Sequence, residues 1–171
     1  MLCMNIVKTK LDGVLLIKPD IYEDFRGINM ELHNDTVFRK NGINITFMQD
    51  NISVSSKGVL RGIHGDDYTW KLMSCVSGRV YFVVVNCTAR SPDFGKWESF
   101  ILSDANRYQV LVPPLYGNAH LVLTDSVIMH YKLSAHYNRE EQFSYRWDDK
   151  RFNIWWPITH PLLSHRDEIG S

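Results

Sequence analysis

The chain has few cysteines: among 171 residues there are only Cys3, Cys75 and Cys87, and no two are spaced as Cys-x-x-Cys. An odd count without such a pair argues against a disulfide framework and against a cysteine zinc site. Cys75 and Cys87 lie in apolar, strand-like runs and are interpreted as small core residues. A reducing compartment is the simplest setting, so we expect a cytoplasmic protein.

The chain also lacks an excess of either charge. Lysine plus arginine and aspartate plus glutamate both number 19, which gives a net charge of zero. No broad basic field indicates nucleic acid as a partner, and no acidic tail indicates a charged partner. No apolar run is long enough to cross a membrane. The apolar stretch at residues 1–16 is interrupted by Lys8, Lys10 and Asp12, which makes it a poor signal peptide.

Helical patterns are scarce as well, and most of the chain is typical of β-strands. One short helix is predicted over Asp35–Lys40, capped by Asn34 or Asp35. Short strands alternate with turn signals such as Ser-Lys-Gly, Ser-Gly and Pro-Pro, which favours a sandwich or barrel. With no repeat or linker, we expect a single domain over residues 1–171. The predicted strands span residues 14–18, 43–53, 59–64, 71–76, 80–85, 97–102, 108–112, 120–123 and 127–133.

Two segments carry information about packing. Tyr81–Val85 is apolar at every position, whereas a strand with one face in water would alternate, so we expect it to be buried on both faces. It would lie between two sheets or against a second subunit. Residues 147–156 are rich in tryptophan and aspartate, and we expect them to pack back across the body.

Chemistry is first suggested by the segment from Val59 to Asp66. It places Arg61 and His64 at the end of an apolar strand, beside glycines that allow a ligand to approach the backbone. A general base with a phosphate anchor is one interpretation, and an edge histidine with a solvated arginine is the other. Strict alternation puts Arg61 and His64 on opposite faces, so sharing a ligand requires a bend or bulge near Gly62.

Other candidates are ambiguous when taken alone. Lys71 shares a predicted strand face with apolar residues, so it either has a partner or ligand or extends into water from the strand end. Tyr131 lies on the same strand face as Met129 and Leu133 and would be buried. The hydroxyl of a buried tyrosine commonly makes a hydrogen bond with only a structural role. His120 and Asp167, taken as loop residues, would ordinarily be solvated.

A metal site also needs consideration, because β-barrels often hold iron or zinc. Such sites commonly use a His-x-His pair, and none of the seven histidines forms one. His64 and Asp66 could form half of a site, completed by His120 or His130. We expect no metal and no other cofactor.

A series of short motifs then resembles one family, the dTDP-4-dehydrorhamnose 3,5-epimerases and their relatives. The resemblance runs from about Val14 to Asp167, and its strength lies in a dozen motifs in the same order. They include Asp-Phe-Arg-Gly at 24–27, Gln-Asp-Asn-Ile-Ser at 49–53, Gly-Val-Leu-Arg-Gly-Ile-His at 58–64, Lys-Leu at 71–72, Ser-Pro-Asp-Phe-Gly-Lys-Trp at 91–97, Tyr-Lys at 131–132, Trp-Asp-Asp at 147–149 and Leu-Ser-His-Arg-Asp at 163–167.

The resemblance implies a mainly β fold, a cupin-type jelly roll with little helix, and a homodimer that exchanges an N-terminal strand. It implies a nucleoside-diphosphate 4-keto-6-deoxy sugar as the substrate, with inversion at C3, C5 or both, in the synthesis of bacterial surface polysaccharides. By the same resemblance, His64 is the catalytic base, Asp167 orients it, Tyr131 is the acid and Lys71 lies beside the keto oxygen. The residues implied for substrate binding are Arg26, Arg61, Gln49, Asn51, Tyr22, Glu31 and Tyr137, and the altered segment that carries Asn118 and His120 also belongs to the pocket.

These roles agree with elementary chemistry. Hydrogens on the carbons beside a keto group are acidic because the carbanion spreads onto the oxygen. Inversion needs a base on one face and a proton donor on the other, and histidine has a pKa suited to the base. Lysine can stabilise charge on the oxygen, and arginine matches the geometry of a diphosphate.

The chain departs from the family pattern at four positions. Asn118 stands where the family has histidine, and His120 stands where it has an aromatic residue. Phe82 and Asn86 stand where acids are usual. The pocket is therefore altered, and the true substrate is expected to differ from the rhamnose precursor. The pairing of His-Gly-Asp with Gly-Asn-Ala-His also resembles a branch that acts on GDP-linked 4-keto-6-deoxy-heptoses for capsule or lipopolysaccharide.

Three alternatives stay open at this point. A 3,4-ketoisomerase of the cupin type would act on similar substrates and move the keto group. A binding protein could keep the jelly roll without its chemistry, which the changes at Phe82 and Asn118 suggest. A metal-dependent cupin is the third.

Overall fold

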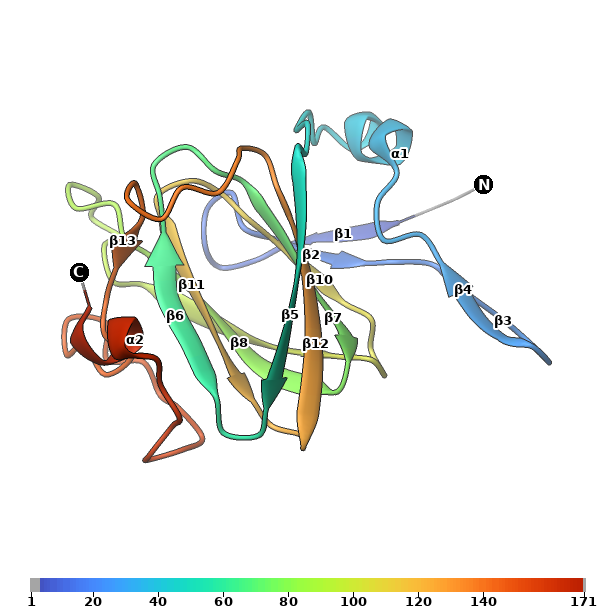
Figure 1. Cartoon of the computed structure of the whole chain (residues 1–171). Helices are drawn as coiled ribbons and strands as arrows, with labels where there is room; N and C mark the ends of the chain where they lie inside the picture. The colour runs from blue at the N-terminus through green and yellow to red at the C-terminus, as the bar shows by residue number, and fades with distance from the viewer. Residues whose placement is uncertain (1–3, 171) are drawn as a thin grey trace.

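The computed structural model describes residues 4–170, and it consists mainly of β-strands packed as two facing sheets (Figure 1). The mainly β architecture with little helix is therefore confirmed. The strands are β1 (Asn5–Lys8), β2 (Leu15–Lys18), β3 (Ile21–Asp24), β4 (Gly27–Met30), β5 (Gln49–Ser56), β6 (Leu60–Gly65), β7 (Lys71–Ser77), β8 (Arg79–Asn86), β9 (Trp97–Ser103), β10 (Gln109–Val112), β11 (Tyr116–Val122), β12 (Ser126–Leu133) and β13 (Phe143–Ser144). The helices are α1 (Asp35–Lys40) and α2 (His165–Ile169).

The strand order explains how the two sheets close around an interior. One sheet has six strands in the order β1-β2-β10-β7-β12-β5, and the other has five in the order β13-β6-β11-β8-β9. All the paired strands within them run antiparallel. The chain passes from β5 in one sheet to β6 in the other through a short turn, from which the two strands diverge (Figure 1). The small β3–β4 hairpin projects away from the barrel as a separate arm (Figure 1).

The five-stranded sheet is buried on both faces, and β8 shows this most clearly. Phe82 and Val84 pack into the cluster between the sheets, whereas Val83 and Val85 pack into a second cluster on the outer face. The C-terminal segment covers that outer face with Phe152, Trp156 and neighbouring aromatic residues. Both packing expectations, for Tyr81–Val85 and for residues 147–156, are confirmed, and the first is satisfied within one chain.

The local signals located most elements correctly. Helix α1 has the predicted bounds, and its N-cap Asn34 accepts a hydrogen bond from the backbone N–H of Val37 at 3.3 Å. Two predicted strands were wrong in extent: β5 begins at Gln49 rather than at residue 43, and β11 begins at Tyr116 rather than at residue 120. His120 was expected to be a solvated loop residue, but it lies within β11 and is buried, so that expectation was wrong. Strands β1, β3, β4 and β13 and helix α2 were not predicted.

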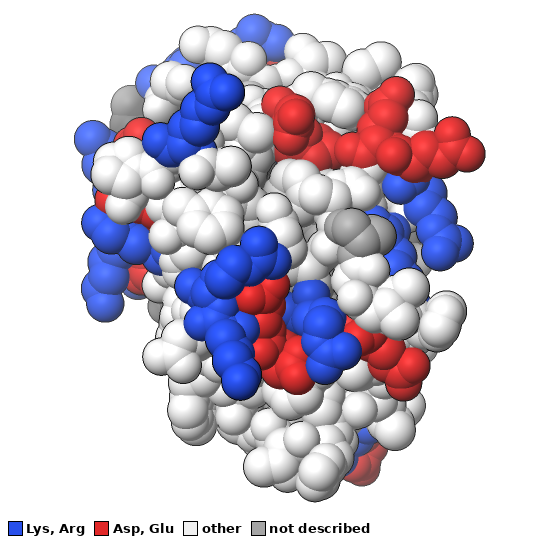
Figure 2. Space-filling model, turned by 90° about the vertical axis from the view of Figure 1, so that its left-hand side faces the viewer, with Lys and Arg blue, Asp and Glu red and all other residues white. Residues whose placement is uncertain are grey.

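The surface agrees with a chain of balanced charge. On the face formed by β13, α2 and the C-terminal segment, basic and acidic groups lie side by side (Figure 2). Two examples are the ion pairs Arg146–Asp148 at 2.9 Å and Arg151–Asp149 at 2.6 Å. Within residues 4–170, neither helix has the length and apolar character needed to span a membrane.

Candidate active site

A cavity of about 270 Å³ lies between the two sheets, at the end of the barrel where β6 ends and β7 begins. Its walls come from β5, β12 and β7 of the six-stranded sheet, from β6 and β11 of the five-stranded sheet, and from the C-terminal part of the chain. The lining residues are Asn51, Ser53, Arg61, His64, Lys71, Met73, Asn118, His120, Tyr131, Leu133, Tyr137, Gln142 and Arg166. Most of the residues expected from the sequence therefore meet in one place.

A β-bulge in β6 brings Arg61 and His64 to the same cavity. His64 pairs with Asn118 and Arg61 pairs with His120, so three steps on β6 match two steps on β11. One extra residue reverses the alternation and puts both side chains on one face. Gly62 makes the bulge possible: its φ is +115°, and an added Cβ would lie 2.5 Å from the Asn118 carbonyl oxygen. The bend predicted near Gly62 is confirmed.

Behind His64 lies a buried carboxylate. The His64 Nε2 atom is 2.8 Å from Asp167 Oδ1, although the ring N–H does not point along the line to the oxygen. Catalytic contacts of this kind often align only when substrate binds. Asp167 lies on α2 and is 2% exposed, so the expectation of a solvated loop residue was wrong.

Three groups hold the Asp167 carboxylate. Besides His64, its oxygens accept hydrogen bonds from Ser164 Oγ at 2.6 Å and from the Gly62 backbone N–H at 3.2 Å. Burial alone would raise the pKa of Asp167, but these contacts outweigh it and lower that pKa. Asp167 therefore stays ionised and can hold a protonated His64 in place.

Lys71 is buried in the opposite sheet and reaches across the cavity. Its Nζ donates to the His64 carbonyl oxygen and to Asn118 Oδ1, both at 3.4 Å, and the residue is 6% exposed. Of the two interpretations of Lys71, the structure supports the buried residue with partners. Burial lowers its pKa to about 8, against a smaller opposing effect of Asp66. An ammonium near its pKa in a dry site can stabilise an oxyanion.

Tyr131 faces the cavity from β12, directly opposite Asn51 on β5. Burial raises the pKa of its hydroxyl, with smaller opposing effects of Arg61 and Asn51, so the hydroxyl keeps its proton. The prediction that Tyr131 points inward is confirmed. Its sheet differs from that of His64, so the two side chains approach the cavity from opposing walls.

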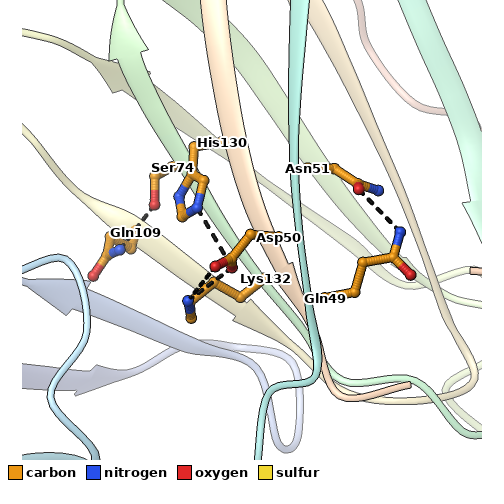
Figure 3. A network of polar contacts seen from close by, with 7 residues as sticks. All are labelled: Gln49, Asp50, Asn51, Ser74, Gln109, His130 and Lys132. Atoms are coloured by element: carbon orange, nitrogen blue, oxygen red, sulfur yellow. Dashed lines mark hydrogen bonds and ion pairs between the residues drawn. The ribbon is translucent and has the colours of Figure 1, made fainter. Parts of the chain in front are cut away.

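The polar side chains of β5 point alternately toward the cavity and away from it. Figure 3 shows Asp50 turned toward Lys132 and His130 on one side and the hydrogen-bonded pair Gln49–Asn51 on the other. Gln49 Nε2 donates to Asn51 Oδ1 at 2.9 Å, and Gln49 Oε1 accepts from the Tyr137 backbone N–H at 2.8 Å. Gln49 thereby links β5 to the loop that places Tyr137 at the cavity.

Two of the departures from the family pattern are direct neighbours. Phe82 on β8 and His120 on β11 are cross-strand partners. Phe82 is fully buried in the core between the sheets, and His120 is 4% exposed and lines the cavity. Asn86 is also buried and donates to the Tyr116 hydroxyl at 3.3 Å, which gives it a structural role.

Three predicted binding residues do not reach this cavity within the chain. Tyr22 and Arg26 belong to the projecting β3–β4 arm, and Glu31 follows it. Tyr22 is 51% exposed, and Arg26 makes an exposed ion pair with Asp24 at 2.7 Å. Within one chain, these three residues therefore lie apart from the cavity that contains His64, and their predicted role in binding stays a prediction.

Conversely, Ser53, Arg166 and Gln142 line the cavity without having been predicted as site residues. Ser53 and Arg166 lie within motifs that were recognised, two residues after Asn51 and one before Asp167. Strand alternation from Asn51 was an available signal for Ser53. No local signal points to Gln142, because its position depends on a loop that returns to the barrel.

The half metal site suggested by the sequence does not assemble. Asp66 Oδ1 accepts backbone hydrogen bonds from Tyr68 and Thr69, at 3.2 and 2.6 Å, and so caps a turn. His130 lies on the opposite face of its strand from Tyr131, beside Asp50 (Figure 3). Across residues 4–170, no three histidine, cysteine, aspartate or glutamate side chains converge as metal ligands would.

Comparison with known proteins gives consistent similarities. A family model described as dTDP-4-dehydrorhamnose 3,5-epimerase matches residues 8–171. The dTDP-4-dehydrorhamnose 3,5-epimerase of Shigella flexneri is 40% identical over 171 residues, which cover 98% of this chain and 94% of the relative.

Solved structures agree with this. The dTDP-6-deoxy-D-glucose-3,5-epimerase of Legionella pneumophila, in complex with dTDP-4-keto-L-rhamnose, matches with a TM-score of 0.92 at 36% identity, covering 96% of this chain and 90% of that one. A 3'-monoepimerase from Streptomyces bikiniensis, in complex with dTDP-quinovose, matches with a TM-score of 0.88 at 33% identity, covering 93% and 83%. The expected jelly-roll fold is thus confirmed.

Proposed function

The chain belongs to the dTDP-4-dehydrorhamnose 3,5-epimerase family, and from that premise we propose that it inverts a carbon beside the keto group of a nucleoside-diphosphate 4-keto-6-deoxy sugar. The family is one of isomerases that act in sugar biosynthesis. The observation that carries the proposal is the pair of His64 and Tyr131, which approach one cavity from opposing sheets. Inversion needs this arrangement, because a proton leaves one face of the carbon and another arrives on the opposite face.

His64 is the proposed base. Its ring takes the proton from the carbon next to the keto group, and the ionised Asp167 stabilises the imidazolium that results. The electron pair left on carbon moves onto the keto oxygen as an enolate. Lys71, whose Nζ donates to Asn118 Oδ1, is the group proposed to stabilise that oxygen. Tyr131 then protonates the carbon from the other wall, and the double bond of the enolate returns to the carbonyl.

The nucleotide end of the substrate is proposed to lie toward the mouth of the cavity. Arg61 and Arg166 both line the cavity, and their guanidinium groups suit the oxygens of a diphosphate. Gln49, Asn51 and Tyr137 form the adjoining wall. The relatives reported above are dTDP-sugar enzymes, so dTDP is the first nucleotide to test and GDP is the second. The product would supply bacterial surface polysaccharides, among them capsule or lipopolysaccharide.

The deciding experiment follows substrate hydrogens in deuterated water. The purified protein is incubated with dTDP-4-keto-6-deoxyglucose, and C3 and C5 are monitored by NMR. Deuterium at both carbons with inversion supports a 3,5-epimerase, whereas deuterium at C3 alone supports a 3-epimerase. The alternative 3,4-ketoisomerase would instead give a product with its carbonyl at C3. His64→Ala serves as the control, and exchange that survives in it would argue against the assigned base.

We also propose that the arm completes the site of a second copy in a homodimer. Tyr22, Arg26 and Glu31 match the family's nucleotide contacts but lie outside the cavity of their own chain. An arm that projects from the barrel can reach a partner (Figure 1). Mixing the His64→Ala and Arg26→Ala proteins tests this, because a hybrid dimer would regain one intact site. No gain of activity on mixing, with subunit exchange verified, would contradict it.

A further inference from the structure

Two polar atoms at the inner end of the cavity have no hydrogen-bond partner among residues 4–170. They are Ser53 Oγ and His120 Nε2, and both are inaccessible to solvent. His120 as a whole is 4% exposed, and both residues line the cavity. Buried polar atoms are nearly always satisfied in folded proteins, so two unsatisfied atoms in one cavity call for a ligand group.

The strand registers place these two groups at the same level of the barrel, on facing sheets. Ser53 lies two residues beyond Asn51 on β5, and His120 lies two residues beyond Asn118 on β11, in each case toward the turn that joins β5 to β6. Arg61 joins them: it is the cross-strand partner of His120, and its Nε donates to Ser55 Oγ at 2.9 Å. The inner end is thus bounded by β5, β6 and β11.

Beside the positively charged Arg61, the two unsatisfied groups of this end are themselves uncharged. Burial, together with the nearby Arg61 and His64, lowers the pKa of His120 to about 4, so its ring is neutral at physiological pH. A neutral imidazole and a serine hydroxyl each offer a donor and an acceptor. A methyl group would leave both atoms unsatisfied, and the one carbonyl of the proposed substrate is already assigned to Lys71. A hydroxyl group matches both, since it donates and accepts at once.

We propose that the inner end of the cavity is a hydroxyl subsite, in which Ser53 and His120 bind one hydroxyl substituent of the sugar ring. The inference rests on the proposed function in taking the ligand to be a nucleotide sugar. It adds a specificity-determining pair that takes no part in proton transfer itself. The pocket then selects sugars by a hydroxyl as well as by the keto group, because a sugar without that hydroxyl leaves the subsite unsatisfied.

Binding of unreactive sugars tests this without depending on turnover. The ligands are dTDP-glucose and GDP-glucose and the 2-deoxy, 3-deoxy and 6-deoxy analogues of whichever binds, measured by calorimetry. We expect the native protein to bind the 2-deoxy or the 3-deoxy analogue about ten-fold or more weakly than the parent. The 6-deoxy analogue should bind about as well as the parent, because the proposed substrate has no 6-hydroxyl. His120→Phe and Ser53→Ala should reduce that ratio to about two-fold or less. Ser56→Ala, on the outward face of the same strand, should leave the ratio unchanged.

The outcomes separate the two proposals. If the native protein binds the parent and all three analogues equally, the subsite is refuted while the proposed function stands. The same holds if both variants keep the native ratio, because the hydroxyl is then read elsewhere. If the native protein binds neither parent sugar, the proposed function itself fails and the subsite with it. Should His120→Phe not fold, as judged by circular dichroism, Ser53→Ala alone decides.

Discussion

The two walls of the cavity are built in different ways. The wall that carries Tyr131 is a regular antiparallel pair, β5 and β12, in unbroken register from Ser56–Ser126 to Gln49–Leu133. The wall that carries His64 depends on a bulge, on a glycine in a left-handed conformation and on a carboxylate from a distant helix. Strand alternation alone orients Tyr131, whereas the orientation of His64 depends on all three of these features.

The difference reflects what each group must do. A proton donor needs only to point at the substrate from a fixed strand. A base must in addition be oriented and must have its new positive charge stabilised, and in this fold that requires a buried partner. The complexity of the His64 wall is therefore expected to make it the more fragile of the two.

The largest effect is expected from Gly62→Ala, which breaks the bulge. The new Cβ would meet the Asn118 carbonyl oxygen at 2.5 Å and Ala119 Cβ at 2.6 Å, at a φ of +115°. We expect a loss of roughly 3 kcal/mol or more in the free energy of unfolding, and no detectable epimerisation in any folded fraction. Urea denaturation and the deuterium-exchange assay measure the two effects.

Gly27→Ala is the matched control for that variant. Gly27 has nearly the same φ, +117°, but nothing lies within 4 Å of its added Cβ. The backbone cost alone, about 1–2 kcal/mol, should appear there. Equal losses in the two variants would mean that the contact with β11 is unimportant.

The next effect in size is expected from Asp167→Asn, which leaves the His64 wall folded but removes its charge. We expect kcat to fall by about 10²–10⁴-fold with little change in KM, because the imidazolium forms only during the reaction. Steady-state kinetics on the keto sugar measures both constants. A change confined to KM would assign Asp167 to substrate binding instead.

Asp167 should also contribute to stability in a pH-dependent way. Its pKa is lowered in the folded protein, so the carboxylate stabilises the fold above the ordinary value of 3.8, and the stabilisation is lost as the pH falls below it. The stability difference between native protein and Asp167→Asn should therefore shrink on acidification. A difference that stays constant from pH 7 to pH 3 would contradict this.

On the regular wall, Tyr131→Phe is expected to slow inversion by about 100-fold and to change the free energy of unfolding by less than about 0.5 kcal/mol. Deuterium exchange should persist, because His64 can still remove a proton and return one to the same face. Comparing isotope incorporation with inversion in one NMR experiment separates the two steps. Parallel loss of both would mean that Tyr131 is needed before proton removal.

The smallest effect on activity is expected from the titration of Lys71, which bridges the two walls. Its pKa is lowered to about 8, so activity should decline several-fold as the pH rises through that value and the ammonium is lost. The free energy of unfolding should rise between pH 8 and 10.5, by on the order of 3 kcal/mol. In this range Lys71 stays protonated in the unfolded chain but is deprotonated in the folded one. In Lys71→Met this rise in the free energy of unfolding should be absent. A rise that persists in the variant would have to come from other titrating groups.

The sequence predicted the regular wall better than the bulged one, for physical reasons. Alternation along β12 was enough to turn Tyr131 inward, and the cap at Asn34 was enough to locate α1. The partnership of His64 with Asp167 spans about a hundred residues, and it was inferred from family resemblance alone. The unsatisfied Ser53 and His120 could not be predicted, because the absence of a partner is a property of the assembled core. The arm residues matched a motif whose geometry one chain does not complete.

The two buried thiols have a practical consequence. Cys75 lies in the core between the sheets and Cys87 in the core outside them. Burial raises the pKa of Cys75 to about 11 and that of Cys87 to about 12, so neither is an appreciable thiolate near neutral pH. An alkylating reagent should therefore modify each thiol only when its own core opens. In a Cys3→Ser background, the labelling rates of Cys75 and Cys87 would measure separately how often the inner and the outer core open.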